Sequence, residues 1–259
     1  MLKLYVLDLL FPKLDCSLCG KNINNPKSTK SDNYLINRLS KLPNICGYCK
    51  EQMLVPLMPY CASCHKPLKN SFNSDKNNIC SDCRNLSNRN FIFNRSAILY
   101  NDFAKDLIAL YKYRGKQSLV NEFSYFLMAT YECYYKDLKI DYLTYVPIHN
   151  NRLQERGFNQ AELLTVRLHE LSGIPILDTL ARKRDTFKQS KQGKKERFRQ
   201  IEGTFSLRHG IDKQIENKNI LIIDDIYTTG ATINECASVL KTVRANNVYS
   251  LTLSRAYNF

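Results

Sequence analysis

Residues 220–232 read Ile-Leu-Ile-Ile-Asp-Asp-Ile-Tyr-Thr-Thr-Gly-Ala-Thr, and this stretch carries the strongest prediction of the fold. Its apolar start suits a buried strand, and a hydroxyl-rich turn leads from the strand into a helix. A loop that enters a helix N-terminus offers free backbone N–H groups and the positive end of the helix dipole, which suit a phosphate dianion. Gly230 permits close approach of the backbone, and threonine hydroxyls add donors. The stretch therefore predicts a phosphate-binding loop in an α/β fold.

Two carboxylates, Asp224 and Asp225, stand directly before this loop. There they would repel a phosphate, unless they accept hydrogen bonds from sugar hydroxyls or help to position Mg²⁺ on the far side of the sugar. We expect Asp225 to be an exposed carboxylate that supports the ligand and not the core. The alternative is a strand end at which the aspartates act only as caps.

Apolar runs alternate with helical patterns outward from this stretch. Predicted strands cover residues 91–100, 142–148, 219–223 and 248–253, and predicted helices cover residues 102–111, 119–135, 159–171 and 231–244. Asp102 is the expected cap of the first helix, and Gly173 and Pro175 are stop signals for the third. This alternation predicts a mainly parallel sheet with helices on both faces.

Eight of the ten cysteines form four Cys-x-x-Cys pairs, namely Cys16/Cys19, Cys46/Cys49, Cys61/Cys64 and Cys80/Cys83. Each pair points two thiolates at one ion, so two pairs complete a closed tetrahedral site and four pairs predict two structural Zn²⁺ ions. We pair them in sequence order, and an interleaved order stays open, as does redox chemistry. Cys133 and Cys236 are expected to be small core residues. His65 is expected at the surface.

The chain is basic, with 38 Lys and Arg against 24 Asp and Glu, a formal charge of +14. Two Cys₄ zinc sites of about −2 each would lower this to about +10. Residues 182–199 hold nine Lys and Arg against only Asp185 and Glu196. Such a segment is either a basic loop that meets anions or simply a solvated one.

The 259 residues are enough for one α/β domain and a smaller module. We predict a zinc-ribbon module with two Cys₄ sites over residues 1–90 and the α/β domain over residues 91–259. The short apolar run at the start is interrupted by Asp8 and has no small-residue cleavage site, and no stretch reaches the length of a membrane span. We therefore expect a soluble, cytoplasmic protein without a transmembrane segment.

Residues 220–232 resemble the phosphoribosyl pyrophosphate (PRPP) motif of type I phosphoribosyltransferases. The resemblance implies that Asp224 and Asp225 hold the ribose hydroxyls, as the catalytic carboxylates of such a site. The backbone and hydroxyls of Thr228, Thr229, Gly230, Ala231 and Thr232 would hold the 5-phosphate. In this fold the loop after an early strand binds the pyrophosphate, here residues 147–152, and we add Arg152 and Arg156 to the PRPP-binding residues. A basic loop, here residues 182–197, closes over the ligand.

A second resemblance covers nearly the whole chain. Residues 156–160 (Arg-Gly-Phe-Asn-Gln) resemble the signature of the competence protein F family (ComF/ComFC and GntX-type proteins). The agreement extends to Val146-Pro147, Arg152, residues 111–115, residues 182–189, Arg197, and the cysteine pairs after residues 9–12. The long insertion between Cys19 and Cys46 departs from the more compact cysteine arrangement that we expect of the family.

The family resemblance implies the handling of imported single-stranded DNA in natural transformation, at the cytoplasmic side of the membrane and near the DNA-uptake machinery. Candidate DNA contacts are Lys188, Lys191, Lys194, Lys195 and Arg197, with Phe187 and Phe198 as stacking residues. The alternative is a phosphoribosyltransferase, resembling an amidophosphoribosyltransferase or a nucleobase-salvage enzyme, that transfers ribose 5-phosphate from PRPP to a nitrogen nucleophile. We favour DNA handling, with PRPP as a bound ligand, and leave turnover open.

Overall fold

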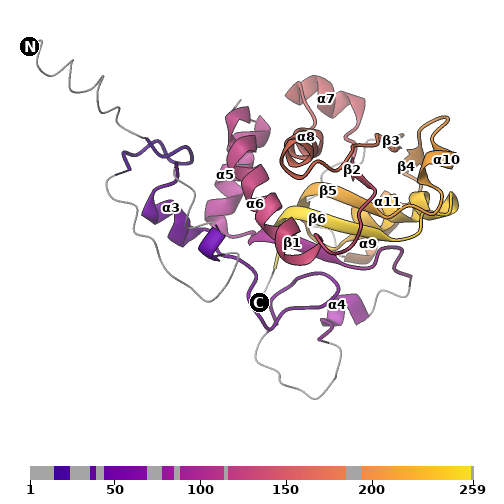
Figure 1. Cartoon of the computed structure of the whole chain (residues 1–259), viewed down its shortest axis with the longest axis horizontal. Helices are drawn as coiled ribbons and strands as arrows, with labels where there is room; N and C mark the ends of the chain where they lie inside the picture. The colour runs from indigo at the N-terminus through magenta and orange to yellow at the C-terminus, as the bar shows by residue number, and fades with distance from the viewer. Residues whose placement is uncertain are drawn as a thin grey trace, which may run out of the picture.

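A four-stranded parallel sheet organises the chain (Figure 1). The structure is a computed structural model, and it describes residues 15–23, 36–38, 44–68, 78–84, 88–113, 116–184 and 194–257. The strand order is β1-β6-β5-β2, and all three pairings are parallel. The strands are β1 (Asn94–Leu99), β2 (Tyr142–Tyr145), β5 (Ile220–Tyr227) and β6 (Val248–Arg255). The predicted α/β class with a mainly parallel sheet is confirmed.

Helices cover both faces of the sheet because the strand residues alternate between two cores. Leu221 and Ile223 belong to one core, whereas Ile220 and Ile222 belong to the other, and all four are fully buried. The first core also takes residues from three helices, α5 (Asp102–Tyr113), α6 (Val120–Tyr134) and α8 (Gln160–Ser172). The second core takes residues from α11 (Ala231–Thr242). Burial of every β5 residue from 220 to 223 explains its continuous apolar run.

The helix ends agree with the sequence in two places and differ in one. Asn159 accepts a hydrogen bond from the Ala161 N–H and so caps α8, and Gly173 ends that helix with φ of 74°. For α5, however, the cap is not Asp102. The side chain of Asn101 accepts from the Ala104 N–H, and Asp102 is already the first helical residue. Asn and Asp side chains can both cap a helix, and a sequence pattern does not fix the start of a helix to within one residue.

A second, two-stranded antiparallel sheet was not predicted. It joins β3 (Leu180–Arg182) to β4 (Phe205–Leu207), and strands of three residues leave no periodic pattern to detect. The basic segment is the connection between these strands and contains α9 (Lys194–Ile201), which packs against α11. Lys188, Lys191 and Phe187 lie outside the described residues. The remaining short elements are α3 (Gly47–Gln52), α4 (Ser81–Arg84), the 3₁₀ turn η1 (Gln117–Leu119), α7 (Asn150–Arg156) and α10 (Asp212–Ile215).

The cysteine-bearing segments pack directly against this fold. Residues 54–63 run along the outer side of β1, where the Leu99 N–H donates to the Leu54 carbonyl at 2.7 Å and the Asn94 N–H donates to the Ser63 carbonyl at 2.8 Å. This contact covers the edge of the sheet, which would otherwise expose unpaired backbone groups. The division into two domains at residue 90 stays a prediction.

None of the helices that the structure describes combines the length and the apolar character that crossing a bilayer requires.

Candidate functional site

The predicted site lies where β5 extends beyond the end of its neighbour, β2. Strand β2 ends at Tyr145, opposite Ile223, whereas β5 continues to Tyr227. Asp224 and Asp225 therefore lie beyond the end of β2, at the edge where its following loop, residues 146–149, also leaves the sheet. Carboxyl ends of parallel strands are where α/β folds bind ligands. The topology thus brings the predicted sugar-binding carboxylates to the same edge as residues 147–149 of the predicted pyrophosphate loop. The rest of that predicted loop, residues 150–152, is the start of helix α7.

The two carboxylates differ in their environment. Asp224 accepts a hydrogen bond from the Asp225 N–H at 2.8 Å, and burial together with the neighbouring Asp225 carboxylate raises the pKa of Asp224 to about 8. Asp225 forms an ion pair with Lys112 of α5, and only 14% of its side chain is exposed. The expectation of an exposed Asp225 is therefore wrong. Cations and hydroxyl donors favour the charged form of a carboxylate. Binding of such a ligand to Asp224 and Asp225 would therefore lower the pKa of Asp224 and favour loss of its proton.

The phosphate loop, residues 228–232, connects β5 to α11. Gly230 has φ of 85°, and a Cβ at this position would lie 2.6 Å from Cζ of Tyr227 and closer still to its hydroxyl oxygen. Glycine is therefore required for two reasons, the left-handed backbone and the space against a buried tyrosine. Helix α11 begins at Ala231, and the first N–H groups of a helix have no intrahelical acceptor. The Ala231 N–H donates to Oγ1 of Thr229 at 3.4 Å, and the amides that follow it in the first turn of α11 can be presented to an anion, as the sequence predicts.

Residues 156–160 hold the loop after β2 in place. Asn159 donates from its side-chain amide to the Val146 carbonyl at 3.2 Å while it caps α8. Arg156 donates to Oε1 of Gln160 at 2.9 Å and to the hydroxyl of Tyr113 at 2.7 Å. The Arg156 guanidinium also lies 4.8 Å from the centre of the Tyr113 ring. The structure therefore gives Arg156 a fixed place between α5 and α8, and ligand contacts for Arg152 and Arg156 stay predictions.

The basic segment is only partly described. Lys194, Lys195 and Arg197 lie on α9, and Phe198 on the same helix is half-buried. Because α9 packs against α11, the helix that follows the phosphate loop, the described end of the basic segment lies against the body of the molecule. DNA contacts by these residues stay a prediction.

The eight paired cysteines form two groups in sequence order. The first cysteine group is Cys16, Cys19, Cys46 and Cys49, the second is Cys61, Cys64, Cys80 and Cys83, and the four sulfur atoms of each group lie within 4.8 Å of one another. The expected pairing is confirmed. A tetrahedral zinc with Zn–S bonds of about 2.3 Å needs sulfurs about 3.8 Å apart. Cys19 and Cys46 bring their sulfurs to 3.7 Å, and so do Cys64 and Cys80. Both groups could hold a structural zinc ion.

We predict two zinc equivalents in protein purified without added metal, because both groups have the sulfur spacing of a closed Cys₄ site. Elemental analysis measures the metal, and titration of free thiols is its control. A metal content near zero, with all eight thiols reactive or oxidised, would contradict zinc in these groups.

Of three single cysteine and histidine residues, one lies where the sequence predicts and two do not. Cys236 is fully buried on α11, as expected, but Cys133 is exposed. His65 is fully buried and not at the surface. Its Nδ1 accepts the N–H of Ser96 at 3.0 Å, so the imidazole completes the bonding of edge strand β1. A histidine side chain that accepts from a strand N–H, in place of a neighbouring strand, leaves no pattern in the sequence, so its burial could not be predicted.

Comparison with known proteins places the chain in a family. No family model matches the sequence. The chain is 30% identical over 250 residues to competence protein ComFC of Bacillus subtilis (strain 168), which covers 94% of this chain and 96% of that protein. It is also 30% identical over 243 residues to competence protein ComFC of Streptococcus pneumoniae, covering 93% of this chain and all of that protein. The chain belongs to the ComFC family. This confirms the resemblance that its motifs indicate.

Other similarities cover less of this ComFC-family chain. DNA utilization protein YhgH of Salmonella typhi is 33% identical over 101 residues, 39% of this chain and 43% of that protein. Among solved structures, the glutamine PRPP amidotransferase of B. subtilis aligns with 56% of this chain and 30% of its own, with 18% identity and a TM-score of 0.37.

Two functional candidates in the ComFC-family chain were not predicted from sequence. Lys112 was noted only as part of a family motif, yet it is the ionic partner of Asp225. Arg255, the last residue of β6, contacts both the second cysteine group and the start of the phosphate loop. Lys112 is 113 residues from Asp225, and Arg255 is 191 residues from Cys64, so no local pattern could have paired them.

Proposed function

We propose that this ComFC-family protein binds PRPP with Mg²⁺ at the carboxyl edge of its sheet and handles imported single-stranded DNA in the cytoplasm during natural transformation. The observation that carries the ligand assignment is the joint placement of Asp224 and Asp225 with the Gly230 loop at the N-terminus of α11. A carboxylate pair suits the ribose hydroxyls, and the helix N-terminus suits the 5-phosphate.

The DNA half of the proposal rests on two supports. Relatives over more than nine-tenths of the chain carry the name competence protein, and a partial relative carries the name DNA utilization protein. The second support is the basic segment between β3 and β4, which holds nine Lys and Arg over residues 182–199. Cations in such a segment bind a phosphate backbone without reading its sequence.

Turnover is tested by incubating the protein with labelled PRPP and Mg²⁺, with and without single-stranded DNA. If PRPP is a bound ligand only, pyrophosphate release should stay at the background rate under both conditions. Release that depends on Asp225 and on a nitrogen nucleophile would instead identify a phosphoribosyltransferase, the alternative function.

Single-stranded DNA should bind with a steep salt dependence that flattens when Lys188, Lys191, Lys194 and Lys195 are changed together to glutamine. Each phosphate contact that is lost lowers the slope of log K against log[salt] by roughly 0.7, so the quadruple variant should lose about two units or more. Fluorescence anisotropy over a salt series measures the slope. Saturating PRPP, which is proposed to meet the same segment, should compete with the strand or change its slope.

The matched control removes four lysines that lie exposed on other parts of the fold, Lys105, Lys136, Lys139 and Lys213. Both quadruple variants lower the net charge equally, so only a local contact distinguishes them. An equal effect in the two variants would show general electrostatic attraction and would reject the basic segment as the DNA site.

A further inference from the structure

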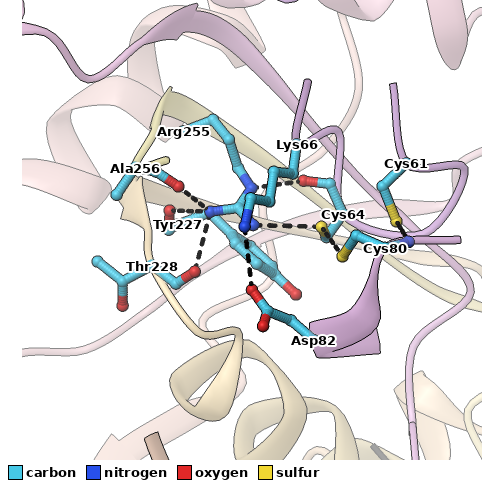
Figure 2. A network of polar contacts seen from close by, with 9 residues as sticks. All are labelled: Cys61, Cys64, Lys66, Cys80, Asp82, Tyr227, Thr228, Arg255 and Ala256. Carbon is cyan, nitrogen blue, oxygen red and sulfur yellow. Dashed lines mark hydrogen bonds and ion pairs between the residues drawn. The ribbon is translucent and has the colours of Figure 1, made fainter. Parts of the chain in front are cut away.

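Arg255 lies between the second cysteine group and the phosphate loop (Figure 2). It is 2% exposed, and its guanidinium donates in two directions. On one side Nε donates to the Cys64 carbonyl at 2.8 Å, and Nη2 donates to Cys64 Sγ at 3.2 Å. On the other side Nη1 donates to the carbonyls of Tyr227 at 3.2 Å and Thr228 at 2.9 Å. One planar group thus joins a candidate metal ligand to the first residues of the loop.

A buried guanidinium needs compensating charge, and among the described partners of Arg255 that charge can come from the cysteine group. The Tyr227 and Thr228 partners are neutral carbonyls, and the Tyr227 ring lies 4.8 Å from the guanidinium carbon. Four thiolates around one Zn²⁺ carry a net charge of about −2, which would offset the arginine. A donor to a ligating sulfur is also a typical outer-shell contact of a metal centre. The position of Arg255 is therefore best satisfied when the second cysteine group holds its metal.

The fixed geometry of arginine makes the two sides interdependent. Its donors form a rigid fork, so a shift of Cys64 that turns the guanidinium also moves the bonds to Tyr227 and Thr228. Tyr227 is buried, and its ring lies beside Gly230, whose backbone shapes the loop. A lysine at position 255 would have a single side-chain nitrogen and could not donate both to Cys64 and to the carbonyls of Tyr227 and Thr228 as the guanidinium does.

We propose that Arg255 couples metal occupancy of the second cysteine group to anion binding by the phosphate loop. Arg255 acts as a positioning residue: the metal centre holds the loop in its binding conformation, and a bound phosphate retains the metal. Coupling between two sites is reciprocal, so each ligand strengthens the other by the same factor. The phosphate half of this inference rests on the proposed PRPP function, whereas the contact of Arg255 with the metal centre does not.

The first cysteine group provides an internal control. In both groups a backbone N–H donates to a ligand sulfur at 3.3 Å, Cys46 to Cys16 Sγ and Cys80 to Cys61 Sγ. The two groups lie in cores on opposite faces of the sheet, and the sulfur that Arg255 contacts belongs to the second. Ligand-dependent changes in metal retention should therefore be confined to the second group.

The test follows zinc transfer from the full, zinc-loaded chain to a chromophoric chelator. We expect two release phases, and saturating PRPP with Mg²⁺ should slow one of them about fivefold or more. The variant Cys19→Ser, which alters the exposed ligand of the first group, should leave only the phase that PRPP slows. Equal slowing of both phases would show general stabilisation of the fold and would overturn the coupling.

The variant Arg255→Lys keeps the positive charge but loses the rigid set of guanidinium donors. Zinc release from the second group should become about fivefold faster without any ligand, and PRPP should no longer slow it, while release from the first group stays unchanged. If PRPP does not bind the parent chain, the proposed function fails, and the ligand-free rates of the two proteins still test the metal half. Unchanged release from the second group in Arg255→Lys would overturn that half. If this variant does not fold, the effect of PRPP on the two phases of the parent chain decides the question.

Discussion

Gly230→Ala should weaken PRPP binding at least a hundredfold and destabilise the protein. The new Cβ would lie 2.6 Å from Cζ of Tyr227, in a backbone with φ of 85°. The left-handed backbone costs about 1–2 kcal/mol for an L-residue, and forcing a side chain into a packed site adds about 1–3 kcal/mol. Displacing the loop would misalign its amides, and losing two hydrogen bonds to a charged phosphate costs about 3–6 kcal/mol. Isothermal titration calorimetry and chemical denaturation measure the two effects.

Gly210→Ala is the matched control for backbone strain. Gly210 has φ of 78°, and a Cβ there meets no atom within 4 Å. The control should show the strain alone, with PRPP affinity unchanged. Equal loss of stability in the two variants, with full PRPP affinity in Gly230→Ala, would reject the close packing of Tyr227 as the reason for glycine in the loop.

Asp225→Ala should weaken PRPP binding at least tenfold. A charge-assisted hydrogen bond contributes about 1.5–3 kcal/mol, and about 1.4 kcal/mol corresponds to one decade of affinity. Calorimetry measures the affinity. Glu170→Ala, which removes a carboxylate from the exposed pair with Arg167 on α8, is the control and should bind PRPP normally.

The ion pair with Lys112 requires a second variant in this experiment. Removing Asp225 leaves the Lys112 ammonium, only 15% exposed, without that partner, and an unpaired buried charge lowers stability. The double variant Lys112→Met/Asp225→Ala removes both charges. It should regain thermal stability without regaining affinity. Recovery of PRPP affinity in the double variant would show that the freed lysine, and not the lost carboxylate, weakened binding.

Much of the fold could be predicted because its signals are local. Residues 220–223 are apolar without interruption, since both faces of β5 are buried, and Asn159 and Gly173 mark the ends of α8. The Cys-x-x-Cys spacing is equally local, because two thiolates on one turn meet one ion. These features need only a few neighbouring residues. They were sufficient to predict the α/β class, the cysteine groups and the family.

Other features depended on where distant segments meet. The burial of His65 follows from its contact with β1, and the partial burial of Asp225 follows from its contact with Lys112 on α5. The sequence by itself determined which residues are the candidates for the chemistry: the acidic pair, the glycine loop and the cysteines. The tertiary structure alone decided their electrostatic state and their connections, as Arg255 illustrates by joining Cys64 to Thr228. The physical reason is that charge, burial and hydrogen bonding depend on distances in space, and a pattern along the chain specifies those distances only within a turn or two.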